Sequence, residues 1–161
     1  MTGAFQRGAS NFGKCDAPDS RRPNSYSLKM TKGARKQLGA LGERLAAQLL
    51  TQKGMRILAR NWRCSRGEID IIARDRDTLV IVEVKTRRGR NAGTPEEGVD
   101  ERKQAKLCIL AQCYIETIGW EGDARIDVVA VELSPAGQLL RVTHWPNAVE
   151  CWDLWMNDVW F

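Results

Sequence analysis

Two apolar runs separated by a short charged turn constrain the fold of this chain most strongly. Residues 68–73 (EIDIIA) and 79–86 (LVIVEVKT) are rich in β-branched side chains, and the turn between them is polar. This pattern predicts an antiparallel hairpin. The second run is apolar throughout its first half, as expected of a central strand covered on both faces. The chain is therefore expected to build a sheet around this hairpin.

The segments around the hairpin predict further strands and two helices. Leucines recur at spacings of three and four over residues 34–53, which indicates an amphipathic helix. A capping box at Thr94-Pro95-Glu96-Glu97 predicts a second helix that runs to about Ile118. Three more strands are expected, over residues 55–62, 125–133 and 139–145. The predicted order is α-β-β-β-α-β-β, an α/β domain in which helices flank a mixed central sheet.

The two ends of the chain differ from this domain, which spans residues 34–148. Residues 1–33 are basic, rich in Gly, Ser and Asn, and without apolar periodicity, which predicts a disordered tail. An arm that touches phosphates is the alternative interpretation of this tail. Residues 149–161 place three tryptophans on one helical face and predict an amphipathic helical extension. Packing on the sheet is the simpler role for that face, and a homodimer or partner surface is the alternative.

Several classes of protein are excluded by what the sequence lacks. No run approaches the ~18 apolar residues of a membrane span, and no apolar secretory signal begins the chain. The five cysteines are scattered without a CxxC pair, which fits neither a disulfide framework nor a zinc ribbon and predicts a reducing, cytoplasmic setting. Cys108 and Cys113 are interpreted as small packing residues. The single histidine, His144, has no obvious partner, is interpreted as structural, and excludes an HExxH metalloprotease.

Three charged residues interrupt the apolar hairpin and identify a candidate site. Glu83 and Lys85 point to the same face of their strand, and Asp70 lies on the neighbouring strand. Buried charges are costly unless they are paired or bound to a metal. Two close carboxylates favour a hard cation such as Mg²⁺ (or Mn²⁺), and a nearby lysine could act on an attacking water. A structural ion pair explains Glu-x-Lys alone, but Asp70, together with Glu43 on the preceding helix, favours the metal site.

The chain resembles a known family in four segments: GALGE at 39–43, NWRCSRGEIDIIA at 61–73, VEVKTR at 82–87 and VDERKQ at 99–104. RIDVVAV at 125–131 extends the match. The family is the YraN-like family (uncharacterised protein family 0102), within the PD-(D/E)xK nuclease superfamily of restriction-endonuclease-like fold. The resemblance covers roughly residues 36–148. It implies that Asp70 and Glu83 bind the metal, that Lys85 is the catalytic lysine, and that Glu43 supports the metal or its waters. It also suggests that Lys103 and Gln104 could reach the substrate.

Charge is distributed unevenly along the chain and indicates an anionic partner. Residues 107–161 carry two basic and eight acidic side chains, whereas arginines bracket the candidate site. Such clusters suit a phosphodiester backbone and predict contacts with nucleic acid. The sequence has no zinc-finger, RNP or KH signature, so it does not support base-specific readout. The residues expected to make these contacts are Arg63, Arg66, Arg87, Arg88, Lys103 and Gln104. Asp127 is interpreted as a salt-bridge partner of Arg125 or of a neighbour in the sheet, with a place near the site as the alternative.

Two functions remain open on the sequence. The first is a metal-dependent endonuclease that hydrolyses phosphodiester bonds in DNA, including branched or structured DNA. The second is a nucleic-acid-binding module that keeps the nuclease fold without catalysis. The intact acids and lysine favour the first, because binding alone has no use for carboxylates that face phosphate.

Overall fold

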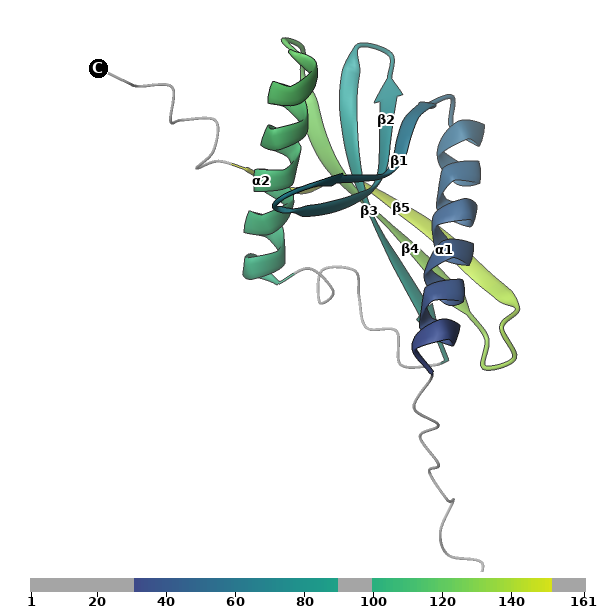
Figure 1. Cartoon of the computed structure of the whole chain (residues 1–161). Coiled ribbons are helices and arrows are strands. Elements are labelled where there is room, and N and C mark those ends of the chain that lie inside the picture. The colour runs from purple at the N-terminus through teal and green to yellow at the C-terminus, as the bar shows by residue number, and fades with distance from the viewer. Residues whose placement is uncertain (1–30, 90–99, 152–161) are drawn as a thin grey trace, which may run out of the picture.

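The predicted order of helices and strands is confirmed by the computed structural model, which describes residues 31–89 and 100–151 of the 161. Figure 1 shows one helix on each side of a twisted sheet. The elements are α1 (Lys32–Gln52), β1 (Arg56–Cys64), β2 (Gly67–Asp75), β3 (Thr78–Arg88), α2 (Glu101–Ile118), β4 (Ala124–Leu133) and β5 (Leu139–Val149). Each predicted strand is present, although β5 extends four residues beyond its predicted end at residue 145.

The described part of the chain forms a mixed sheet in which the strands lie in sequence order, β1-β2-β3-β4-β5. β3 and β4 pair in parallel, and α2 provides the crossover between them. The other neighbours are antiparallel, including the predicted hairpin of β2 and β3. β3 is therefore the central strand, and its apolar half, Leu79–Val82, is fully buried.

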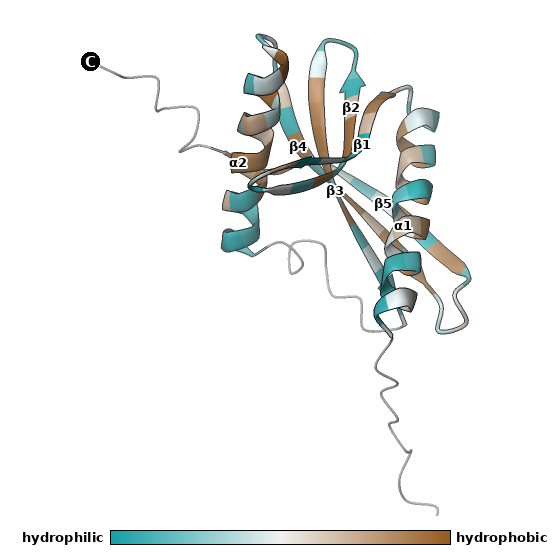
Figure 2. Cartoon of the chain, in the orientation of Figure 1, coloured by the Kyte–Doolittle hydropathy of each residue, from teal (hydrophilic) through white to brown (hydrophobic). Residues whose placement is uncertain are grey.

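Each face of the sheet packs against one helix. Side chains of α1 such as Ala46 and Leu50 cover one face, and Leu107, Leu110 and Tyr114 of α2 cover the other. Figure 2 shows the apolar colour concentrated in the strands and the hydrophilic colour on much of the two helices. The buried line of α1 runs through positions 42, 46 and 50, so the leucine stripe that predicted this helix flanks the contact rather than forming its centre.

The start of α2 differs from the prediction. The helix begins at Glu101, and its N-cap is Asp100, whose carboxylate accepts a hydrogen bond from the Lys103 backbone N–H at 2.8 Å. The capping box predicted at residues 94–97 is therefore not the start of this helix. Aspartate is among the strongest N-cap residues, and here it satisfies one of the free N–H groups of the first turn.

A glycine lets α1 approach the sheet closely near the candidate site. Gly42 is buried, and a Cβ atom at this position would overlap the side chain of Thr86 on β3. Any larger side chain would push the helix away from the strand. The adjacent residue, Glu43, is thereby held close to the end of β3.

The hairpin of β1 and β2 leaves the sheet at the candidate site. The β1–β2 ladder continues to the pair Cys64 and Gly67, but the β2–β3 ladder stops at the pair Ile71 and Val82. The free tip of the hairpin packs against α2, where the rings of Trp62 and Tyr114 meet edge to face with centroids 5.2 Å apart. Strand β2 thus opens away from β3 where Asp70 and Glu83 stand.

The cysteines correct one prediction. Cys108 of α2 and Cys151, which follows β5, form a disulfide across 43 residues of sequence. Cys108 is therefore not a free packing residue, and the statement that the cysteines fit no disulfide is wrong for this pair. Sequence spacing could not reveal it, because only the return of β5 beside α2 brings the sulfurs together. Cys113 carries a free thiol, and the cytoplasmic setting stays a prediction.

Some predictions concern the chain beyond these elements. The basic tail, up to residue 30, and the tryptophan face at 152–160 lie outside the described residues, so the homodimer stays a prediction. The first helix begins at Lys32, two residues before its predicted start. Neither of the helices in the described ranges is long and apolar enough to cross a membrane.

Candidate functional site

Asp70 occupies the point where β2 and β3 part. Its Oδ2 atom accepts a hydrogen bond from the backbone N–H of Val84 at 2.7 Å. The carboxylate thus takes the place of a ladder partner for β3. This contact joins the two strands beyond the end of their regular pairing and fixes Asp70 beside Glu83.

The pKa of Asp70 is raised from its ordinary 3.8 to about 6. Burial is the main cause, and repulsion from Glu83 and, less strongly, Glu43 adds to it, against the lowering effects of the Val84 hydrogen bond and of Lys103. Asp70 therefore interacts electrostatically with Glu83 and Glu43, and the three carboxylates form one acidic cluster. The ionised form of Asp70 is therefore costly in the protein alone and would be favoured by an added cation.

Glu83 is held by two lysines from different elements. It lies on β3 and is only 5% exposed. Its Oε1 atom contacts Lys85 Nζ at 2.9 Å and Lys103 Nζ of α2 at 3.0 Å. A buried carboxylate needs such compensation. Both ammonium groups contact Oε1, and the Oε2 atom takes part in neither ion pair. The site thus combines one buried carboxylate with two ammonium groups that neutralise it.

Glu43 joins the site from α1. Its Oε2 atom accepts a hydrogen bond from Asn61 Nδ2 at 2.6 Å and lies 3.9 Å from an Arg60 guanidinium nitrogen. Burial raises the pKa of Glu43; Arg60 lowers it, and repulsion from Glu68 raises it further. The predicted helical acid therefore lies within electrostatic reach of Asp70, with its carboxylate oriented by two residues of β1.

Asn61 is a site residue that the sequence interpretation missed. It has a φ of 51°, in the left-handed region that asparagine tolerates better than most residues. An asparagine within a run of apolar and basic strand residues was the available signal. Its position follows from the backbone of β1 and could not be read from side-chain alternation alone.

The carboxylates of Asp70 and Glu83 are the groups at this site that could hold a divalent cation. Within the described ranges, no three Asp, Glu, His or Cys side chains are grouped as a ready metal site. Mg²⁺, however, binds proteins through one or two carboxylates and completes its shell with water and substrate phosphate. Asp70 and Glu83 meet that requirement, because both are carboxylates in a partly dry cluster. The residues thus fit a substrate-completed Mg²⁺ site rather than a closed one.

The basic residues predicted to contact nucleic acid are placed in different ways. Arg63 pairs with Glu68 across the β1–β2 hairpin at 2.9 Å and remains largely exposed. Arg66 is exposed in the hairpin turn. The Arg88 guanidinium instead donates to Pro135 O at 2.8 Å, toward the turn between β4 and β5. Arg87 and Gln104 are half-buried, at the end of β3 and in the first turn of α2.

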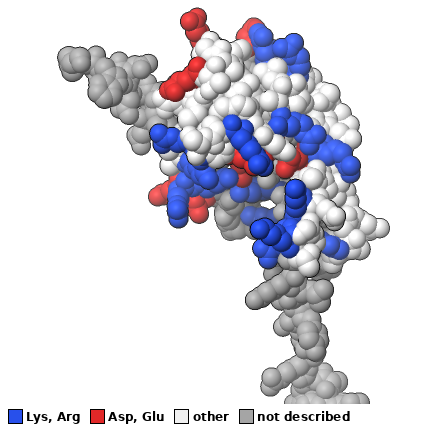
Figure 3. All heavy atoms as spheres, viewed as in Figure 1, with Lys and Arg blue, Asp and Glu red and all other residues white. Residues whose placement is uncertain are grey.

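Acidic and basic side chains gather near the centre of one face of the molecule. Figure 3 shows acidic side chains near the centre of one face, with Lys and Arg side chains on several sides of them. This is the face on which the β1–β2 hairpin lies in front of the sheet (Figure 1). Positive charge on several sides of these carboxylates favours the approach of an anion to this face.

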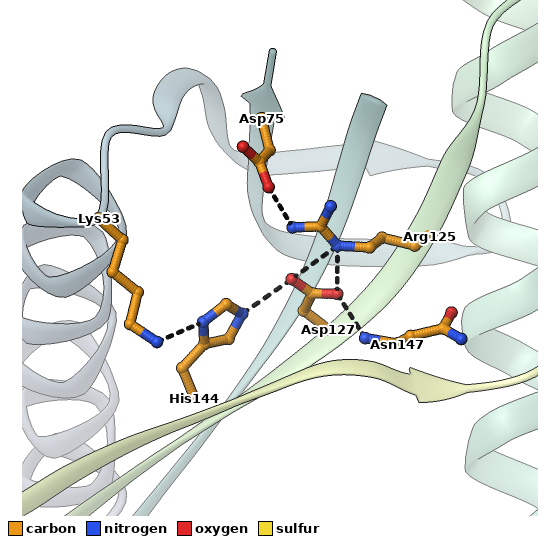
Figure 4. A network of polar contacts seen from close by, with 6 residues as sticks. All are labelled: Lys53, Asp75, Arg125, Asp127, His144 and Asn147. Carbon is orange, nitrogen blue, oxygen red and sulfur yellow. Dashed lines mark hydrogen bonds and ion pairs between the residues drawn. The ribbon is translucent and has the colours of Figure 1, made fainter. Parts of the chain in front are cut away.

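Asp127 lies in a separate network and confirms its predicted pairing with Arg125. It is wholly buried, and its oxygens accept from Arg125 Nε at 3.0 Å and from the Asn147 N–H at 2.8 Å. His144 Nε2 lies 2.8 Å from Asp127, and its Nδ1 lies 3.0 Å from Lys53 Nζ. Figure 4 shows this chain of contacts linking the end of α1 to β4 and β5. The statement that His144 has no obvious partner is therefore wrong.

We expect Asp70→Asn to stabilise the metal-free protein at neutral pH. Because the folded pKa of about 6 exceeds 3.8, wild-type stability should fall as pH rises from about 4 to about 6. The amide carries no charge and should escape this loss, which is at most about 3 kcal/mol. Urea unfolding in EDTA between pH 4 and 8 measures the difference.

The matched control is Asp77→Asn, which removes a carboxylate whose side chain is 98% exposed. Its unfolding free energy should follow that of the wild type across the same pH range. Parallel curves for Asp70→Asn and the wild type would show that Asp70 is not strained by burial and by its acidic neighbours.

Comparison with known proteins places this chain among relatives without an assigned activity. A family model described as "Uncharacterised protein family UPF0102" matches residues 42–131. A UPF0102 protein of Roseiflexus castenholzii is 43% identical over 120 residues, which cover 73% of this chain and 97% of that protein. One from Symbiobacterium thermophilum is 51% identical over 105 residues, covering 65% and 89%. Pyrococcus furiosus SfsA in complex with Ca²⁺ aligns at 13% identity and a TM-score of 0.27, over 73% of this chain and 65% of that chain.

Proposed function

This chain belongs to the uncharacterised protein family UPF0102. From the geometry of its site, we propose that it is a Mg²⁺- or Mn²⁺-dependent endonuclease acting on DNA. The observation that carries the proposal is the meeting of Asp70, Glu83 and Lys85 where β2 parts from β3. This arrangement agrees with the resemblance of the sequence to PD-(D/E)xK nucleases. The proposal therefore includes membership of that superfamily, with its restriction-endonuclease-like fold.

Asp70 and Glu83 would hold the metal. The raised pKa of Asp70 supports this role, because a divalent cation would replace a proton on a carboxylate that is expensive to ionise alone. A bound Mg²⁺ supplies Lewis-acid polarisation of the phosphate and a more acidic water. Glu43, held by Asn61 at 2.6 Å, would orient water at the edge of the site.

Lys85 would act on the reacting atoms. Its ammonium group is 2.9 Å from Glu83 Oε1, so it directly contacts one of the two proposed metal ligands. From there it could donate a hydrogen bond to the attacking water or to a phosphate oxygen as negative charge develops. Lys103, on the same oxygen of Glu83, would neutralise that carboxylate and help to receive the phosphate.

The proposal is tested by cleavage of supercoiled plasmid and of a four-way DNA junction in Mg²⁺, Mn²⁺ or EDTA. We expect cleavage with either metal and none in EDTA, and Glu83→Gln should be inactive with both. Comparing the two substrates also shows whether branched DNA is preferred. Binding without cleavage under every metal condition would contradict the endonuclease and favour the non-catalytic nucleic-acid-binding module.

A further inference from the structure

An open groove lies beside the acidic cluster, between α1 and β1. It has a volume of about 480 Å³ and is lined by Arg44, Ala47, Gln48, Thr51, Gln52 and Arg60. Within residues 31–89 and 100–151, no acidic side chain lines it. Most of its exposed lining is apolar, from Ala47 and the aliphatic stems of the long side chains, and two guanidinium groups and two amides stand around it. Such a mixed wall can take the sugars and the phosphates of a nucleic-acid chain.

The polar groups of this groove form a line along the helix. Arg44, Gln48 and Gln52 are spaced at i, i+4 and i+8, so they follow one another on one face over about 12 Å. That length matches about three to four nucleotides of one DNA strand at ~3.4 Å each. Along this line the charged group is the Arg44 guanidinium, and Arg60 of β1 adds a second one across the groove.

The groove is continuous with the candidate site through one contact. Arg60 lines the groove, and its guanidinium lies 3.9 Å from Glu43 Oε2 in the acidic cluster. By contrast, no hydrogen bond or ion pair engages the Arg44 guanidinium within the part of the chain that the structure describes. A chain leaving the site past Arg60 would meet Arg44 next.

We propose that this groove binds the sugar–phosphate backbone of one DNA strand next to the scissile phosphate. Arg44 and Arg60 bind phosphates, and the amides of Gln48 and Gln52 bind phosphate or sugar oxygens. The inference rests on the proposed nuclease function and adds a substrate track on α1 and β1, away from the arginines of the hairpin turn. The track positions the strand and reads its backbone rather than its bases.

The test is binding of a fluorescent 20-base-pair DNA duplex in EDTA, measured by anisotropy at several salt concentrations. Loss of one phosphate contact lowers the salt slope by about 0.9 and weakens binding about tenfold at 50 mM salt. We expect this change for Arg44→Ala and a smaller loss of affinity, with little change in slope, for Gln48→Ala.

Arg141→Ala is the matched control, because it removes the same charge from β5, where Arg141 pairs with Glu132 at 2.7 Å. It should bind like the wild type. If Arg44→Ala also binds like the wild type, or if Arg141→Ala is weakened equally, the groove is not a DNA track, while the endonuclease proposal stands on its cleavage assay. Failure of the wild type to bind the duplex would overturn the track, while the endonuclease proposal would still be decided by cleavage of the plasmid and the junction.

Discussion

Replacing Lys85 by alanine should lower the rate of DNA cleavage by about 10²- to 10⁴-fold, the usual contribution of a positioned proton donor or acceptor. The side chain is half-buried on β3, and its loss leaves Glu83 with the ammonium group of Lys103, so the fold should persist. Single-turnover cleavage at saturating enzyme measures the chemical step, and circular dichroism checks the fold. DNA affinity should change far less than the rate.

A comparison with Lys103→Ala shows whether Lys85 acts on the reacting atoms or only neutralises Glu83. The two lysines contact the same oxygen of Glu83 at 2.9 and 3.0 Å, but they come from different elements. If Lys85 acts on the reacting atoms, its removal should lower the rate at saturation more than removal of Lys103, which should chiefly weaken DNA binding. Equal losses of rate in the two variants would reduce Lys85 to an ion-pair partner of Glu83.

Asp127→Ala should lower the free energy of unfolding by about 3–5 kcal/mol, the cost of removing one partner from a buried ion pair. Its carboxylate is wholly buried and holds Arg125, His144 and the N–H of Asn147 at once. Burial raises the pKa of Asp127, but these three hydrogen bonds outweigh burial and lower it overall. Urea unfolding at pH 7 measures the loss.

Lys53→Met is the control for this network. Lys53 contacts His144 Nδ1 from the exposed end of α1, so its removal should cost less than about 1 kcal/mol.

Because the folded pKa of Asp127 is lowered, the stabilising contribution of its carboxylate is present above the unfolded pKa of about 3.8 and is lost as pH falls through the folded value. An Asp127→Ala variant as stable as the wild type would show that the network contributes nothing to the fold.

Much of the fold could be predicted because local patterns and sheet burial agree. Residues 79–82 are uninterrupted apolar residues, and the structure buries them completely at the centre of the sheet. The start of α2 was missed, since two capping signals stand six residues apart, at Thr94 and Asp100. Propensity alone does not choose between two good caps, whereas contacts of the folded helix do.

The candidate site was predicted in part for a related reason. Glu83 and Lys85 share a face because strand side chains alternate, which is a local rule. The contact of Lys103 with the same oxygen of Glu83 depends on how α2 packs, and the Asn61 contact with Glu43 depends on the left-handed backbone conformation of Asn61 within β1. Neither follows from spacing along the chain.

The sequence by itself determined the order of the elements, the central strand and the identity of the charged residues that interrupt it, because these depend on periodicity and on the cost of burying charge. Only the tertiary structure decided where β2 leaves β3, which lysines neutralise Glu83, that Asp127 binds His144, and that Cys108 meets Cys151. Each of these joins residues distant in sequence or turns on the exact ending of a strand ladder. Such contacts are set by the packing of whole elements, which no local pattern encodes.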